Sequence, residues 1–147
     1  MIRSLPLAGP TPRAGGPVPS WRPAAVQELD AQWTRHGPLT VFTPESRNGV
    51  RAEHYDDQVT WECAARAAAS VVLFWIPRDL KNLPGFTTNV EYGYDLASGR
   101  TVVLGCPPEC PNPERNRYLI YLAHQHGAPV RENLHDTVAA ALGVVRA

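Results

Sequence analysis

The stretch LFWIPRDLKNLPGFTTNVEYGY, residues 73–94, contains an apolar run, a Pro/Gly loop and the start of a helix. The apolar run begins at Val71 and is closed by Pro77. Because it lacks the alternation of a half-exposed strand, it predicts a strand buried on both faces. Gly85 marks the loop, and the capping residues 87–91 predict a helix start. A strand, a loop and a helix N-terminus in this order form the place where parallel α/β sheets bind ligands.

The same alternation of strand and helix extends along the whole chain. We expect strands at residues 2–7, 39–43, 71–76, 101–105 and 128–131, and helices at residues 21–36, 58–69, 88–97, 114–126 and 133–145. Ser20 and Asp57 are expected as N-caps of the first two helices. This pattern predicts one α/β domain over residues 1–147, with a five-stranded parallel sheet and right-handed crossovers.

The expected strand order is 2-1-3-4-5. In that order the winding of the sheet reverses between the first and third strands, so the loops at Gly9 and at residues 77–88 flank one crevice. A glycine directly after the first strand lets backbone N–H groups approach a ligand closely.

Charge and cysteine content restrict the possible partners. The chain has 14 basic and 14 acidic residues, which gives no electrostatic footprint for nucleic acid or an anionic membrane. Three cysteines form a sparse, odd set that fits a reducing compartment. We expect no secretory leader, because Arg3 and Pro6 interrupt the first apolar residues, and no apolar run approaches the ~20 residues that a spanning helix needs. We therefore expect a soluble cytoplasmic protein with a small-molecule ligand.

Glu91 is the main candidate for chemistry, with two interpretations. Thr88-x-x-Glu91 matches a capping box, in which the glutamate bonds back to the backbone of the cap. Alternatively, a carboxylate in the first turn is kept ionised by the helix dipole and faces the crevice as a nucleophile. Glu62 is a possible second carboxylate that would handle a proton or a hydroxyl, or else a solvated residue of a helix face.

Several side chains near these carboxylates could contact a flat base or a polar ligand. Trp61, Trp75, Phe86 and Tyr92 would stack on a base, although aromatic residues at such positions are also typical of a core. The polar segment 44–56 is rich in donors, and its members are Glu45, Arg47, Arg51, Glu53, His54 and Tyr55.

Other site classes lack their signatures. Cys106-x3-Cys110 with His124 and His126 departs from zinc-site spacing, since the two histidines alternate faces of a helix. Ala-Gly-Pro at residues 8–10 is neither a Rossmann fingerprint nor a Walker loop, and there is no Gly-x-Ser-x-Gly elbow. We therefore expect no metal and no cofactor.

Six motifs together resemble the nucleoside 2-deoxyribosyltransferase family, and more closely its small 2-deoxyribosyltransferase-like branch. They are Leu7-Ala-Gly-Pro-Thr-Pro-Arg13, Ser20-Trp-Arg22, Phe42-x-Pro-Glu45, Gln58-x-x-Trp-Glu62, Leu73-Phe-Trp-Ile-Pro-Arg78 and Leu83-Pro-Gly-Phe-Thr-Thr-Asn-Val-Glu-Tyr-Gly93. The resemblance implies a three-layer flavodoxin-like sandwich. It also implies that Glu91 attacks the anomeric carbon of a nucleoside, and that Glu62 lies near the position of an aspartate that assists at the base.

The resemblance further implies which residues bind the substrate, and that the chain forms a homo-oligomer, with a dimer favoured, in which a neighbouring subunit completes the pocket. The expected substrate-binding residues are Gly9, Pro10, Arg13, Trp21, Arg22, Gln58, Trp75, Arg78, Phe86 and Asn89. Arg13, Arg22 and Arg78 would hold a 5′-phosphate if the substrate is a nucleotide, or would be solvated if it is not.

We thus expect an enzyme that cleaves the N-glycosidic bond of a nucleoside or nucleotide and passes the sugar to another base or to water. The alternative is a non-catalytic module that binds a nucleotide or nucleotide-sugar. A receiver-like phosphate-transfer domain is excluded, because Ala8-Gly9-Pro10 lacks the acidic cluster that such a domain needs after its first strand.

Overall fold

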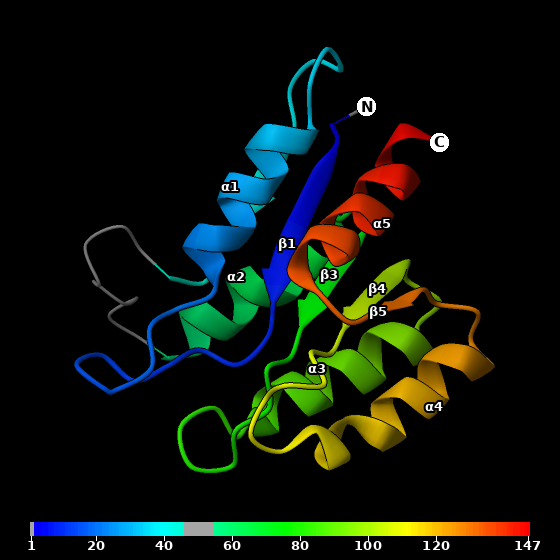
Figure 1. Cartoon of the computed structure of the whole chain (residues 1–147). Coiled ribbons are helices and arrows are strands. Elements are labelled where there is room, and N and C mark those ends of the chain that lie inside the picture. Colours follow the sequence, from blue (N-terminus) through cyan, green and yellow to red (C-terminus); the bar gives the residue numbers. More distant parts are fainter. Residues whose placement is uncertain (1, 46–54) are drawn as a thin grey trace.

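The computed structural model describes residues 2–45 and 55–147, which form a five-stranded sheet flanked by helices (Figure 1). All strand pairs are parallel, and the strand order β2-β1-β3-β4-β5 confirms the sequence prediction. The elements are β1 (Ser4–Ala8), α1 (Arg22–Gln32), β2 (Thr40–Phe42), α2 (Tyr55–Ala67), β3 (Val72–Trp75), α3 (Phe86–Ala97), β4 (Val102–Gly105), the 3₁₀ helix η1 (Pro113–Asn116), α4 (Arg117–Gln125), β5 (Val130–Arg131) and α5 (Leu134–Arg146).

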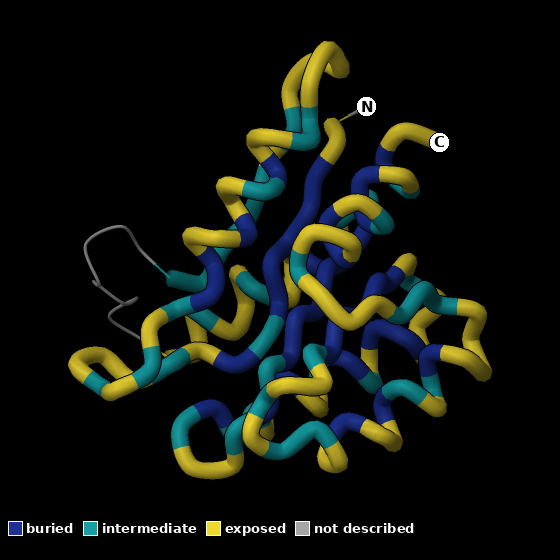
Figure 2. Tube along the Cα trace, in the orientation of Figure 1, coloured by how far each residue is buried: buried dark blue, intermediate teal, exposed yellow. Residues whose placement is uncertain are grey.

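The three central strands are buried along their whole length, as the tube in Figure 2 shows. Alternate residues of each strand enter two separate cores, because successive side chains point to opposite faces of a sheet. Leu5, Leu73 and Val103 pack against α1 and α5, whereas Phe74 and Leu104 pack against α3 and α4. The absence of polar alternation in these strands thus follows from a helix layer on each face.

The helix starts differ from the predictions. α3 begins at Phe86 after Gly85, which takes φ 71°, and its N-terminus has no side-chain cap. The predicted capping box at Thr88 and Glu91 is therefore wrong, and Glu91 is the sixth residue of the helix. α1 begins after Trp21, although the Ser20 hydroxyl does accept a hydrogen bond from the backbone N–H of the first helical residue.

The second helix starts at Tyr55, so Asp57 lies inside its first turn and is not its cap. α1 ends at Gln32 and not at residue 36, because the chain then turns through positive φ at Arg35 and Gly37. The predicted helix 114–126 divides into η1 and α4. Of the polar segment 44–56, residues 46–54, with Arg47, Arg51, Glu53 and His54, lie outside the described part of the chain.

The loop between β3 and α3 is held from inside by Arg78, whose side chain is 1% exposed. Its Nε donates to the Asn116 side chain, Nη1 donates to the carbonyls of Pro84 and Gly85, and Nη2 donates to the Asn89 side chain. Asn116 in turn donates to the carbonyl of Ile76 at the end of the strand. These bonds fix the backbone that precedes α3, and with it the direction of the helix.

In the turn after β1, the backbone at Gly9 comes close to the end of the neighbouring strand β3. This residue has φ 153°, and a Cβ atom there would lie 2.2 Å from the carbonyl oxygen of Trp75 and 2.7 Å from the ring of Trp21. The Trp21 indole N–H donates to the carbonyl of Pro10 and closes the turn. A glycine is therefore required for both conformation and space.

We expect Gly9→Ala to lower the free energy of unfolding by about 3 kcal/mol, because strain and overpacking add at this position. Gly143 in α5 is the matched control, since a Cβ atom there meets nothing within 4 Å. Gly143→Ala should stabilise the protein by up to about 1 kcal/mol through helix propensity. Urea unfolding of both variants checks the pair, and equal midpoints would contradict the role given to Gly9.

We expect Arg78→Lys to cost about 3 kcal/mol of unfolding free energy, because lysine cannot satisfy the two carbonyls and two amide side chains at once. Arg117→Lys on the exposed surface of α4 should change it by less than about 0.5 kcal/mol. Chemical denaturation measures both. If the two substitutions cost the same, Arg78 does not hold the loop.

Candidate active site

A cavity of about 390 Å³ opens at the carboxyl end of β1, between the turn that follows this strand and the loop that leads from β3 to α3. The order of the strands reverses between β1 and β3. A wider groove of about 1,050 Å³ continues from it along the loop that follows β1 and along α2 and α3. Both hollows are bordered by Thr11, Pro44, Glu62, Arg66, Thr87 and Glu91. The crevice predicted between the loops at Gly9 and at residues 77–88 is thus present, and both glutamates lie on it.

Glu91 extends from α3 into this cavity, with 21% of its side chain exposed. Its Oε2 accepts a hydrogen bond of 2.9 Å from Nη1 of Arg66 on α2. Burial raises the pKa of Glu91 above its ordinary value, the Arg66 guanidinium opposes that rise, and the nearby charge of Glu62 adds to it. The carboxylate is therefore partly desolvated and held at one oxygen by a single cation.

Arg66 joins Glu91 to a second, fully buried carboxylate. Its Nε donates to Asp95 Oδ2 at 2.9 Å, and Asp95 is 0% exposed. The other oxygen of Asp95 pairs with Arg100. Asp95 lies one helical turn beyond Glu91 on α3, so the fork of one guanidinium spans both acids.

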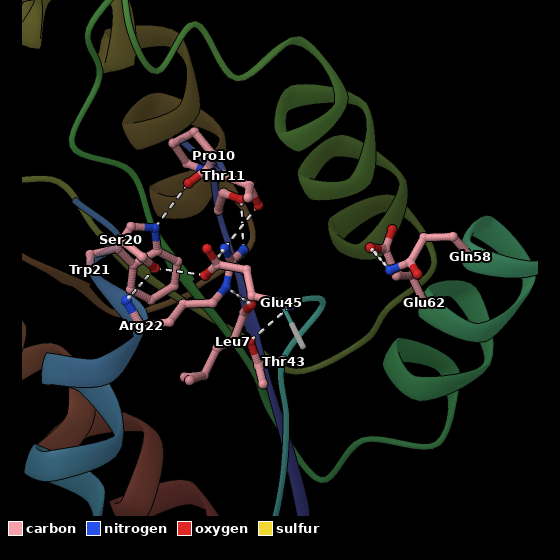
Figure 3. A network of polar contacts seen from close by, with 11 residues as sticks. Leu7, Pro10, Thr11, Ser20, Trp21, Arg22, Thr43, Glu45, Gln58 and Glu62 are labelled. Carbon is pink, nitrogen blue, oxygen red and sulfur yellow. Dashed lines mark hydrogen bonds and ion pairs between the residues drawn. The ribbon is translucent and has the colours of Figure 1, made fainter. Parts of the chain in front are cut away.

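Glu62 supplies the second carboxylate of the cavity from α2. Gln58, one turn earlier on the same helix, donates from Nε2 to Oε1 of Glu62 at 2.9 Å (Figure 3). Glu62 and Glu91 thus come from different helices and line the same space. Such a pair can divide a reaction between a group that attacks and a group that handles a proton.

Arg22 also lines the cavity, and its guanidinium is enclosed by the turn after β1 (Figure 3). It donates to the carbonyls of Leu7 and Gly9 and to the Thr11 hydroxyl, and it pairs with Glu45 at 3.0 Å. Burial lowers the pKa of Arg22, and Glu45 opposes that shift. Four hydrogen bonds leave one of its five N–H groups, so the residue mainly holds the turn.

Three aromatic rings contribute to the lining of the cavity. Phe42 and Trp61 meet edge to face with their centroids 5.9 Å apart, and Phe86 at the start of α3 is 78% exposed. All three line the cavity. Trp75 packs in the core beside α1 and α5, and Tyr92 lies in the opposite core with its hydroxyl bonded to the carbonyl of Leu119.

The structure gathers most of the predicted site residues. Those that border the cavity or the groove are Gly9, Pro10, Arg13, Arg22, Gln58, Glu62, Phe86 and Glu91. Trp21, Trp75, Arg78 and Asn89 do not border them. Trp21 supports the turn from behind, Trp75 is in the core, and Asn89 accepts a hydrogen bond from the buried Arg78. Arg78 is thus enclosed by the loop that it holds and borders neither the cavity nor the groove.

Two residues of the site were missed by the sequence analysis, Arg66 and Asp95. Arg66 follows Glu62 by four residues in an alanine-rich helix, and Asp95 follows Glu91 by four residues. Two charged pairs at helical spacing on neighbouring helices are a signal that could have identified them.

The features of a metal centre are missing from the part of the chain that the structure describes. No group of three or more His, Cys, Asp or Glu side chains there could hold a metal ion. Cys106 is buried, which raises the pKa of its thiol to about 12. Among residues 2–45 and 55–147 there is also no helix that is long and apolar enough to cross a membrane.

A comparison with solved structures finds the same fold in a conserved protein from Enterococcus faecalis V583. The two share 11% sequence identity with a TM-score of 0.66, over 97% of this chain and 99% of the other. None of the curated proteins matches this chain. A family model described as "Nucleoside 2-deoxyribosyltransferase like" matches residues 3–110, which include both glutamates and every motif of the crevice. The chain therefore belongs to the nucleoside 2-deoxyribosyltransferase-like family.

Proposed function

We propose that the protein cleaves the N-glycosidic bond of a nucleoside or nucleotide, with Glu91 as nucleophile, and transfers the (2-deoxy)ribosyl group to another base or to water. The observation that carries this proposal is the presence of two carboxylates from different helices in one small, partly aromatic cavity. Membership of the family supports the class of substrate. The reaction needs no cofactor.

In the first step the Glu91 carboxylate forms a bond to the anomeric carbon while the bond from that carbon to the base nitrogen breaks. The electron pair of the broken bond stays on the base, which takes up a proton. Glu62 lines the same cavity from α2, and we assign it as the group that donates this proton to the base. The product is a glycosyl ester of Glu91 and a free base.

In the second step a water or an acceptor base attacks the same carbon from the face that the first base left. Its proton passes to Glu62, and the Glu91 carboxylate departs with the electrons of the ester bond. Two displacements at one carbon retain its configuration. Whether water or a base arrives decides between hydrolase and transferase, and the aromatic rings of Trp61 and Phe86 favour binding of a flat base.

The groove beside the cavity is where we place the remainder of a larger substrate. Arg13 is exposed on the loop after β1 and borders this groove, as does Arg100. A 5′-phosphate would meet these cations, since Arg22 and Arg78 are committed to their own loops. This makes Arg13 the choice among the three arginines that were expected to bind phosphate.

Incubation with a panel of deoxynucleosides, ribonucleosides and their monophosphates should release or exchange a base. Glu91→Gln should lower the rate at least about 1,000-fold, because the amide cannot attack the anomeric carbon. Chromatography of the free base measures the rate, and rapid quench with mass spectrometry detects the glycosyl ester.

The control is Glu28→Gln on α1, which lies outside both hollows and should keep wild-type turnover. Equal activity in Glu91→Gln and the wild type would remove Glu91 as nucleophile. Tight binding in a calorimeter with no product from any substrate would replace the enzyme with a non-catalytic binding module.

We also propose that the protein is a homodimer formed through α3. Phe86, Val90 and Tyr94 recur at four-residue spacing on one side of this helix and are 78%, 72% and 59% exposed. The stripe borders the open side of the site, and Tyr55 and Val59 of α2 continue it. A second copy packed there would exclude water from the glycosyl ester.

Val90→Glu should turn a dimer into a monomer, because an ionised side chain would be buried in the interface without a partner. Tyr118→Arg is the control on α4, where the tyrosine is 72% exposed and away from the stripe. Sedimentation velocity over a concentration series separates the two variants. A wild type that sediments as a monomer at all concentrations would refute the dimer.

A further inference from the structure

We propose that Arg66 is a positioning residue, which keeps the Glu91 carboxylate ionised and aimed into the cavity while Asp95 and Arg100 hold Arg66 in place. This inference rests on the proposed function, because it assigns the group that prepares the nucleophile. It adds the positive charge of Arg66 to a site in which only the two glutamates were expected to act.

The geometry restrains Glu91 at one oxygen only. Arg66 Nη1 binds Oε2 at 2.9 Å, and Nε of the same guanidinium binds Asp95 at 2.9 Å. A planar guanidinium held at two points cannot rotate without breaking one of its bonds. Glu91 Oε2 is therefore fixed, and Oε1 is the oxygen that we assign to the attack.

Asp95 can hold Arg66 firmly because its own side chain is fully buried on α3. Asp95 is 0% exposed and receives hydrogen bonds from both Arg66 and Arg100. Arg100 follows the end of α3, and its guanidinium also lies over the ring of Tyr94, 5.2 Å from the centroid. A chain of alternating charges thus runs from the surface at Arg100 to the nucleophile in the cavity.

The charges that face Glu91 do not all act in the same direction. Arg66 from α2 and Arg22 from α1 favour its ionised form, whereas Glu62 from α2 and Asp95 from its own helix disfavour it. Burial also disfavours the charge and is the largest influence on the pKa of Glu91. Arg66 is the stronger of the two opposing cations, and it is the one in direct contact.

The experiment compares Arg66→Gln with Arg66→Lys. Glutamine removes the charge, so the acid limb of the pH–rate profile should move to higher pH and kcat should fall by on the order of 100-fold. Lysine keeps the charge but cannot bond to Glu91 and Asp95 together, so the acid limb should stay near that of the wild type while kcat falls. Arg117→Gln, exposed on α4, is the control for loss of an arginine.

A purely structural Arg66 would lower the folded fraction without moving the pH profile. If Arg66→Gln leaves the acid limb where it is in the wild type, the inference is overturned. Asp95→Asn gives a second test, in which both Arg66 and Glu91 are retained. It removes a charge that raises the pKa of Glu91, so the acid limb should move to lower pH while kcat falls.

A titration followed by ¹³C NMR separates failure of this inference from failure of the proposed function. The carboxyl signal of Glu91 is assigned by its loss in Glu91→Gln, and its midpoint should rise in Arg66→Gln. A rise in a protein that releases no base would retain the Arg66–Glu91 coupling and remove the catalytic assignment. An unchanged midpoint in an enzyme that does release a base would keep the proposed function and overturn the role of Arg66.

Discussion

The crevice depends on buried guanidinium groups that bind backbone carbonyls. Where a chain leaves a parallel strand and turns away, its carbonyl groups lose their partners in the sheet and must be satisfied from elsewhere. Arg22 serves the turn after β1 through the carbonyls of Leu7 and Gly9, and Arg78 serves the loop after β3 through those of Pro84 and Gly85. The two loops diverge from neighbouring strands and leave a hollow between them. Each loop is thus held from inside by its own arginine, which fixes the two sides of the hollow.

The carboxylates are placed by this frame through the helices that follow the loops. α3 takes its direction from the loop that Arg78 holds, and it carries Glu91 to the edge of the cavity. α2 contributes Glu62 and Arg66 from one face, four residues apart. The cavity is thus lined by the ends of strands on one side and by charged side chains of two helices on the other. This division is common in doubly wound sheets, where ligands meet loops and helix starts at the switch point.

The parts of the molecule that follow from local pattern could be predicted from the sequence. The unbroken apolar runs of β3 and β4 and the alternation of strands and helices predicted the parallel sheet, and the expected strand order 2-1-3-4-5 is the one observed. The capping box failed because a left-handed Gly85 starts the helix two residues earlier than Thr88, and that start depends on Arg78 binding the loop from within. Trp75 was expected in the site, yet a period of two places it with Leu73, on the face that α1 and α5 cover. Arg66 and Asp95 each follow a glutamate by four residues, a spacing that marks them as candidates, but their contact joins two helices over 29 residues and so could not be predicted from a local pattern.

The earlier start of α3 changes what keeps Glu91 ionised. At the predicted boundary Glu91 would have been in the first turn, where the helix dipole favours an anion. As the sixth residue it lies beyond that turn, where the influence of the dipole has fallen off. A desolvated carboxylate beside Glu62 then needs another source of positive charge, and Arg66 is in contact with it. Replacing a buried ion network with apolar side chains is often neutral or stabilising, so stability alone gives little reason to keep Arg66 and Asp95 between two helices. A catalytic role for Glu91 supplies that reason, because Arg66 favours the ionised form of its carboxylate and Asp95 holds Arg66 in place.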